Sequence, residues 1–111
     1  MIERFIKDSD FGLTICDRKG IITYMNEKAK RIFKDYGDDL TGKSLFDCHP
    51  EPARSKLREM LEKEVKNVYT IEKNGIKKMI YQMPVYEDGV YNGFYELSLE
   101  IPLEMNHFKR S

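Results

Sequence analysis

The sequence of 111 residues contains no tryptophan, only two cysteines and no excess of charge of either sign. Because 19 Lys and Arg residues balance 19 Asp and Glu residues, the chain lacks the broad positive field that attracts nucleic acid, and we expect no nucleic-acid partner. No apolar run approaches the roughly 20 residues that cross a bilayer, and the first residues do not resemble a secretory signal, so we expect no membrane association. Cys16 and Cys48 alone do not predict a disulfide scaffold. These absences indicate a cytoplasmic domain.

The composition is that of a globular protein, with 41% hydrophobic and 34% charged residues. A chain of 111 residues allows one compact domain. We expect a single domain over residues 1–111, with a core over about 8–101, an N-terminal segment over 1–7 and a C-terminal tail over 102–111.

The first half of the chain predicts a β-hairpin followed by a helix. Residues 13–16 and 21–25 have the composition of half-buried strands, and the turn Asp17-Arg18-Lys19-Gly20 joins them. Asn26 can cap a helix over about 27–36, where apolar residues recur at helical spacing.

The middle of the chain predicts short helical turns over 38–49 and then a longer amphipathic helix. Pro50 or Pro52 is suited to the first turn of that helix, because a proline there gives up no needed N–H. Its apolar side would be formed by Ala53, Leu57, Met60, Leu61 and Val65.

The last third of the chain predicts three antiparallel strands. Asn74-Gly75 and Asp88-Gly89 are strong hairpin signals, and they separate strands that start at about residue 68, at 76 and at 90. In residues 90–101 the odd positions are mostly apolar and the even positions mostly polar. The odd face is therefore predicted to be buried, which makes Phe94 an exposed aromatic residue. Together the elements predict an α+β fold.

The order of these landmarks resembles a PAS domain. The segment 17–26 is similar to the opening hairpin of that family, which passes through a D-x-x-G turn and ends on an Asn that begins a helix. Gly42-Lys43-Ser44-Leu45-Phe46-Asp47 resembles its G-x-s-l-f-d segment, and His49-Pro50-Glu51 resembles the entry to its long helix. The closing strands match as well, so the similarity covers about residues 8–101.

The resemblance implies a five-stranded antiparallel sheet in the order 2-1-5-4-3, with helices packed on one face around a pocket. Members of this family mostly sense, dimerise or transmit signals, and few catalyse a reaction. The residues agree, because Ser44, Asp47 and His49 lie too close in sequence to form a catalytic triad. We expect no enzyme and no catalytic residue.

The candidate ligand site consists of residues that the pattern places on the inward face. Tyr69, Tyr81, Met83 and Tyr95 would come from the strands, Leu57 and Met60 from the long helix, and His49 from the rim. Such a pocket would be apolar with a few phenolic hydroxyls, which suits a planar or fatty small molecule. The alternative is that these side chains simply fill the core.

Cys48 and His49 raise the question of a cofactor. His49 as the axial ligand of a haem would make the protein a gas or redox sensor, whereas a structural His49 would only cap the helix that follows. The surroundings of Cys48 do not match the flavin-adduct motif of light-sensing relatives, although a non-covalent flavin stays open. Zinc would require more ligands at close spacing than the chain offers, so we expect no metal.

The other face of the sheet is predicted to be an interface. Thr14, Cys16, Ile80, Tyr86 and Phe94 would face outward there, and exposed apolar patches on a sheet generally mark an interaction surface. The leading hypothesis is a sensory or regulatory module that binds a small ligand and signals through a homodimer or a partner protein. The alternatives are the haem-binding sensor and a ligand-free interaction adaptor.

Overall fold

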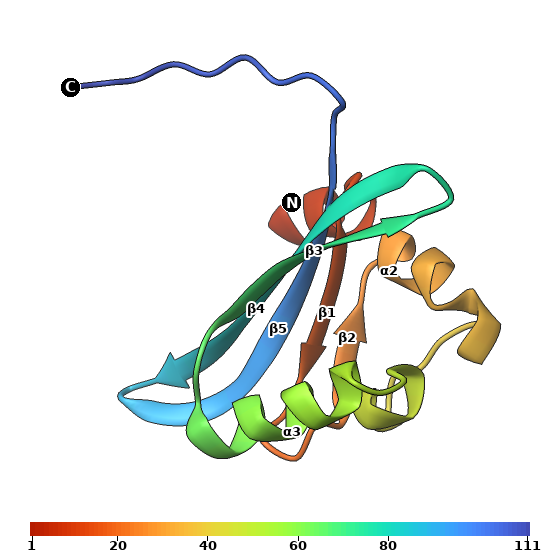
Figure 1. Cartoon of the computed structure of the whole chain (residues 1–111). Coiled ribbons are helices and arrows are strands. Elements are labelled where there is room, and N and C mark those ends of the chain that lie inside the picture. Colours follow the sequence, from red (N-terminus) through yellow and green to blue (C-terminus); the bar gives the residue numbers. More distant parts are fainter.

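The computed structural model describes all 111 residues, and its centre is one antiparallel sheet with the strand order β2-β1-β5-β4-β3 (Figure 1). This confirms the predicted order. The strands are β1 (Gly12–Cys16), β2 (Ile22–Met25), β3 (Asn67–Lys73), β4 (Ile76–Glu87) and β5 (Val90–Ile101). The helices are α1 (Ile2–Lys7), α2 (Glu27–Ile32) and α3 (Ala53–Lys63), with short 3₁₀ helices η1 (Lys34–Tyr36) and η2 (Leu45–Cys48).

The two C-terminal hairpins turn where the sequence predicts them. Asn74 and Gly75 have φ angles of 53° and 76°, and Asp88 and Gly89 have φ angles of 52° and 80°. Positive φ at both central residues defines the type I′ turn, whose twist matches that of the strands it joins. The turn residues therefore determine where β3, β4 and β5 pair.

Asn26 is the residue that joins the N-terminal segment, the sheet and α2. Its side chain is fully buried and makes four hydrogen bonds to the main chain. The Oδ1 atom accepts from the N–H groups of Leu13 and Ala29, and Nδ2 donates to the carbonyls of Ile6 and Phe11. The predicted helix cap is confirmed, and the same amide also fixes the entry to β1.

The helices are shorter than the sequence predicts. The helix expected over 27–36 ends at Ile32 and continues as η1. The long helix is capped by Pro52 and ends at Lys63, because Glu64 adopts a left-handed conformation. Val65 therefore lies beyond the helix and is 43% exposed, whereas Leu57 and Met60 are buried as predicted.

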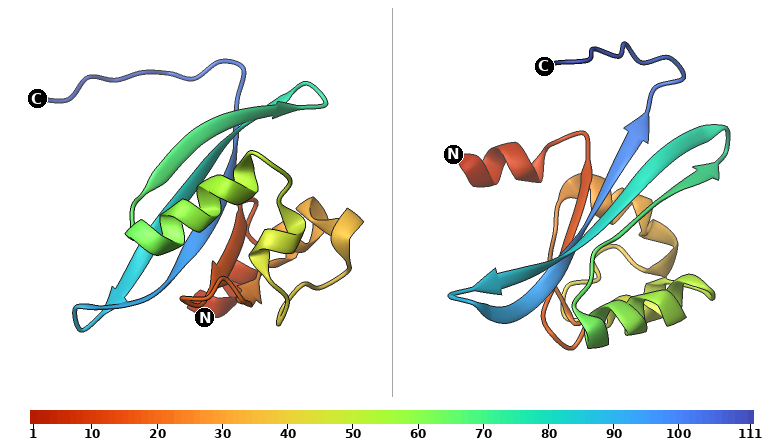
Figure 2. Two further views of the ribbon diagram at one scale, coloured as in Figure 1. Left: turned by 60° about the horizontal axis from the view of Figure 1, so that its bottom comes forward. Right: turned by 60° about the vertical axis from the view of Figure 1, so that its left-hand side comes forward.

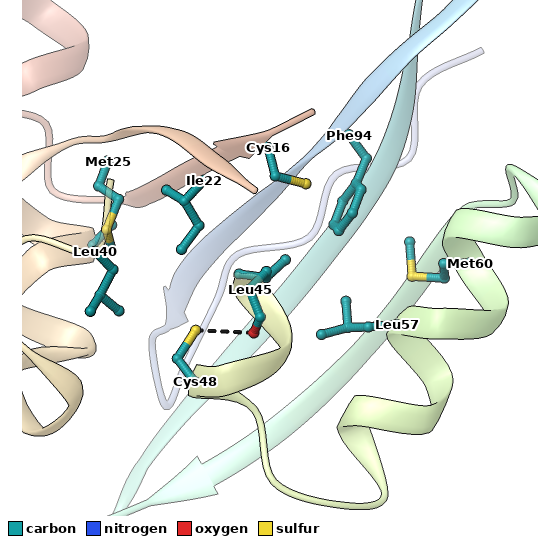
Figure 3. Packing of buried hydrophobic residues seen from close by; sticks show 10 residues of the cluster. Cys16, Ile22, Met25, Leu40, Leu45, Cys48, Leu57, Met60 and Phe94 are labelled. Atoms are coloured by element: carbon teal, nitrogen blue, oxygen red, sulfur yellow. Dashed lines mark hydrogen bonds between the residues drawn. The ribbon is translucent and has the colours of Figure 1, made fainter. Parts of the chain in front are cut away.

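The hydrophobic core lies between the helical layer and strands β2, β1 and β5 (Figure 3). Strand residues Cys16 and Phe94 point toward Leu45 and toward Leu57 and Met60 of α3 (Figure 3). The buried cluster consists of Cys16, Ile22, Met25, Ala29, Leu40, Leu45, Cys48, Leu57, Met60 and Phe94.

The structure reverses the predicted faces of the sheet. Phe94 is not an exposed aromatic residue but is 2% exposed in the core, and its even-numbered neighbours Glu96 and Ser98 are buried with it. The odd residues of β5 are only half-buried and lie on the face away from the helices. Of the residues predicted to face outward, Thr14, Cys16, Ile80 and Phe94 face inward instead, and only Tyr86 is exposed.

Small side chains explain which face the helices cover. Gly12 lies so close to α2 that an added Cβ atom would be 2.8 Å from the Ile32 side chain and 3.4 Å from Ser98 Cβ. Thr14 continues this inward row along β1. A helix can approach closely only where the strands carry such small residues, so α2 packs on the even face although the odd face is more apolar.

The odd face of the sheet remains without a covering helix, and we refer to it as the outer face. Its apolar residues are Leu13, Ile15, Met79, Tyr81, Met83, Tyr95, Leu97 and Leu99. Helix α1 lies apart from the layer formed by α2 and α3, and residues 102–111 extend away from the sheet without secondary structure (Figure 2). None of the helices has the length and apolar character that a membrane span requires.

Candidate functional site

A cavity of about 660 Å³ opens between the helical layer and the hairpin of β3 and β4. Its helical side is formed by α2, η1, the end of η2 and the start of α3, and its sheet side by the inward face of β3, β4 and β5. The lining residues that matter below are Arg31, Ile32, Phe33, His49, Tyr69, Ile71, Lys73, Ile76, Lys78, Ile80, Glu96, Ser98 and Glu100. The volume is that of an ordinary small-molecule site.

Two buried ionisable side chains meet on the wall of this cavity. His49 follows η2 and is 7% exposed, and Glu96 on β5 is 5% exposed. The Nε2 atom of His49 is 3.4 Å from Oε1 of Glu96, while Nδ1 is 3.0 Å from the carbonyl oxygen of Leu45. Both ring nitrogens thus face an oxygen acceptor, which is the arrangement of an imidazolium that donates twice.

The second partner of Glu96 is an amide that belongs to a short chain of polar groups. Gln82 on β4 lies opposite Glu96 and donates from Nε2 to Oε1 over 2.7 Å. Asn67 at the start of β3 donates in turn to Oε1 of Gln82 over 3.0 Å. No buried side-chain nitrogen or oxygen lacks a partner, so the polar wall is satisfied without a ligand.

The charge of His49 follows from this environment. Burial alone would lower its pKa, but the hydrogen bonds to Cys48 and Glu96 and the negative charge of Glu96 outweigh burial and raise the pKa to about 10. His49 and Glu96 are therefore an ion pair at neutral pH. Such a pair in a poorly solvated place is stable only because each member keeps further hydrogen bonds.

Tyr69 is another titratable group on the wall of the cavity. Desolvation and the nearby charge of Glu96 raise its pKa to about 12, and a hydrogen bond with Gln82 only partly opposes them. Its hydroxyl stays protonated at neutral pH and can donate or accept a hydrogen bond.

The structure brings together some of the predicted site residues and separates others. His49 and Tyr69 line the cavity. Leu57 and Met60 are buried in the core, at 1% and 2% exposure, and do not line it. The inward placement of the other three residues, Tyr81, Met83 and Tyr95, is wrong. They lie on the outer face, because they share the odd positions of β4 and β5.

The geometry of His49 does not fit a haem ligand. Both ring nitrogens are engaged, so the imidazole would have to leave either Leu45 or Glu96 before it could bind iron. The neighbouring Cys48 is buried and its Sγ donates to the carbonyl of Leu45 over 3.2 Å. No group of three or more His, Cys, Asp and Glu residues is placed to hold a metal ion.

Sequence reasoning missed the polar inward residues of the sheet, above all Gln82, Glu96 and Ser98. Their position opposite one another, with Gln82 paired to Glu96 and Ile80 to Ser98, could have indicated a polar site. The small residues Gly12 and Thr14 on the same face were the available sign that a helix covers it. The basic residues at the cavity mouth, such as Arg31 and Lys78, belong to no motif that could be recognised in the sequence.

Comparison with known proteins gives consistent results for sequence and structure. A family model described as the PAS fold matches residues 1–73. A search of curated proteins finds no match in sequence. Among solved structures, the Aer2 receptor from Vibrio cholerae, described as a dual PAS-heme oxygen sensor, aligns with a TM-score of 0.63 and 16% identity over 83% of this chain and 95% of that one.

Two further structures extend the similarity over more of the chain. A sensory box sensor histidine kinase from Vibrio cholerae aligns with a TM-score of 0.64 and 19% identity over 93% of this chain and 90% of that one. The PAS domain of BvgS from Bordetella pertussis aligns with a TM-score of 0.63 and 17% identity over 91% of this chain and 84% of that one. At these identities the structural likeness shows the fold.

Proposed function

Because the chain belongs to the PAS family, whose domains are generally sensory modules, we propose that it binds a small molecule in the cavity beside His49 and Glu96 and signals through its outer face. The observation that carries this proposal is the cavity of about 660 Å³, which has apolar walls and a fully bonded polar wall. His49 and Gln82 both bond to Glu96, so His49 and Glu96 are engaged with partners instead of free to act as bases, and this favours sensing over catalysis.

Strand β5 connects the cavity to the outer face. Glu96 and Ser98 line the cavity. Leu97, which lies between them, and Tyr95, which precedes Glu96, point to the opposite face. A ligand that contacts Ser98 therefore acts on the same backbone that carries the centre of the outer face. Ligand binding would favour one arrangement of that face over another, which is a population shift.

We propose that a second copy of the chain covers the outer face. The face is apolar and lacks a helix, and α1 exposes Ile2 and Phe5 to 72% and 68%. Apolar surface of this extent generally marks an interface. A partner protein that competes for the same face would receive the signal.

Freshly purified protein is expected to retain a small molecule in native mass spectrometry, seen as added mass on the 13.2 kDa chain. Ile71→Trp narrows the cavity from the exposed edge strand β3 and should remove most of this bound fraction. Thr70→Trp adds the same bulk on the opposite face of β3 and should leave it unchanged. Protein that carries no added mass in any of the three forms would contradict ligand binding.

The protein is expected to be a dimer by size-exclusion chromatography with light scattering, and Leu97→Lys should convert it to a monomer. Leu97 pairs with Leu13 and Tyr81 at the centre of the outer face, so each copy would bury an unpaired ammonium group. Val90→Lys places the same charge at a hairpin end that is 62% exposed and should leave the dimer intact. A monomeric parent protein at tens of micromolar would refute the dimer.

A further inference from the structure

We propose that the ligand of this cavity is an amphipathic organic anion, with a carboxylate or similar head at the mouth and an apolar body inside. This inference rests on the proposed ligand-binding function and adds the chemical class of the ligand. It follows from the distribution of charged and apolar side chains around the cavity.

Besides His49, four cations and two carboxylates line the cavity, and the carboxylates are already bonded within the protein. The cations are Lys28, Arg31, Lys73 and Lys78, and the carboxylates are Glu96 and Glu100. Glu96 is bonded to His49 and Gln82, and Glu100 is 3.2 Å from Lys28. Each carboxylate of the cavity thus already has a cationic partner within the protein, His49 for Glu96 and Lys28 for Glu100.

Three of the cations remain without a carboxylate partner. Lys28 pairs with Asp10 and Glu100, but Arg31, Lys73 and Lys78 appear in none of the ion pairs of the structure. Arg31 comes from the last turn of α2, and Lys73 and Lys78 come from the hairpin of β3 and β4 on the facing side. The mouth is thus positive on both sides, which favours an anionic group between them.

The cavity also offers apolar surface to the body of such a ligand, beginning at the mouth, where Ile71 and Ile76 are the cross-strand partners of Lys78 and Lys73. Ile32 and Phe33 come from the helical side, and Ile71, Ile76 and Ile80 from the sheet side. Ile71 and Ile76 are 39% and 44% exposed, which leaves apolar surface that a ligand could cover. His49 and Glu96 neutralise each other deeper in the cavity, so the head of an anionic ligand would find its unpaired cations only at the mouth.

The test uses two fluorescent probes of similar size, the anionic 8-anilinonaphthalene-1-sulfonate and the uncharged N-phenyl-1-naphthylamine. Arg31→Ala combined with Lys78→Ala should weaken binding of the anionic probe roughly tenfold, as expected for two charge contacts of about 0.5–1 kcal/mol each. The control Arg18→Ala combined with Lys19→Ala removes the same two kinds of charge from the exposed β1–β2 turn, and it should leave the affinity unchanged. The uncharged probe should respond to neither pair.

Ile71→Trp distinguishes a failure of this inference from a failure of the proposed function, because it narrows the cavity for both probes. If both probes lose affinity in that variant but the anionic probe ignores the loss of Arg31 and Lys78, the site exists and the assigned ligand class is overturned. If neither probe responds to Ile71→Trp, both probes bind elsewhere and the proposed function itself is refuted.

Discussion

Replacing Glu96 by alanine is expected to lower the free energy of unfolding at neutral pH by about 3–5 kcal/mol, the usual effect of removing one member of a buried ion pair. The substitution leaves His49 buried without its counter-charge and removes the acceptor of Gln82, which is 1% exposed. Chemical denaturation followed by circular dichroism measures the change.

The matched control is Glu100→Ala, four residues further along the same face of β5. Glu100 also pairs with a cation, Lys28, but its side chain is 45% exposed. Solvent screens such a pair, so its loss should change stability by no more than about 1 kcal/mol. Equal losses of unfolding free energy for the two substitutions would show that the buried Glu96–His49 pair stabilises the fold no more than the exposed Glu100–Lys28 pair does.

The pH dependence gives a second readout of the same pair. The pKa of His49 is raised from 6.5 to about 10, so between these values the folded state binds a proton that the unfolded state releases. The stability from the pair is therefore fully present below pH 6.5 and falls as pH rises, by at most about 1.4 kcal/mol per pH unit. Glu96→Gln keeps the shape of the side chain but should flatten this slope.

Turn and cap residues made the order of the elements predictable. Asn74-Gly75 and Asp88-Gly89 adopt the backbone conformations that their residue types favour, and Asn26 caps α2. These signals are local, because each depends on the φ angles or hydrogen bonds of a few neighbouring residues. The strand order was predicted from the resemblance to PAS domains, which rests on the first hairpin, the middle segment and the entry to the long helix.

The covered face of the sheet could not be predicted from alternation alone. The pattern in β5 correctly groups Tyr95 with Leu97 and Glu96 with Ser98, but it does not tell which group meets the helices. The inner face can carry polar residues because residues remote in sequence bond to them. His49 bonds to Glu96, and Asn67 bonds to Gln82. That compensation depends on tertiary contacts, which is why only His49 and Tyr69 of the predicted site residues line the cavity.

Gly93 is expected to be the least replaceable glycine of the sheet, and Gly93→Ala should cost roughly 3 kcal/mol or more of unfolding free energy, through backbone strain and a clash. Its φ angle is +128°, and an added Cβ atom would lie 2.1 Å from the carbonyl oxygen of Cys16 on β1. Gly93 pairs with Val85 of β4, next to an irregularity in the pairing between Val85 and Tyr86. If β5 moved away from β1 to make room for a side chain, the pairing of β5 with its neighbouring strands would lose hydrogen bonds.

Gly42→Ala separates the clash from the strain of a positive φ angle. Gly42 has a φ angle of +90°, but no atom lies within 4 Å of the position of its added Cβ. We therefore expect Gly42→Ala to cost only about 1–2 kcal/mol, the strain contribution alone. If thermal and chemical denaturation gave the same loss for both variants, the close approach of β5 to β1 at Cys16 would not be a constraint on the fold. A larger loss for Gly93→Ala would show that the contact between β5 and β1 at Cys16 tolerates no side chain at this position.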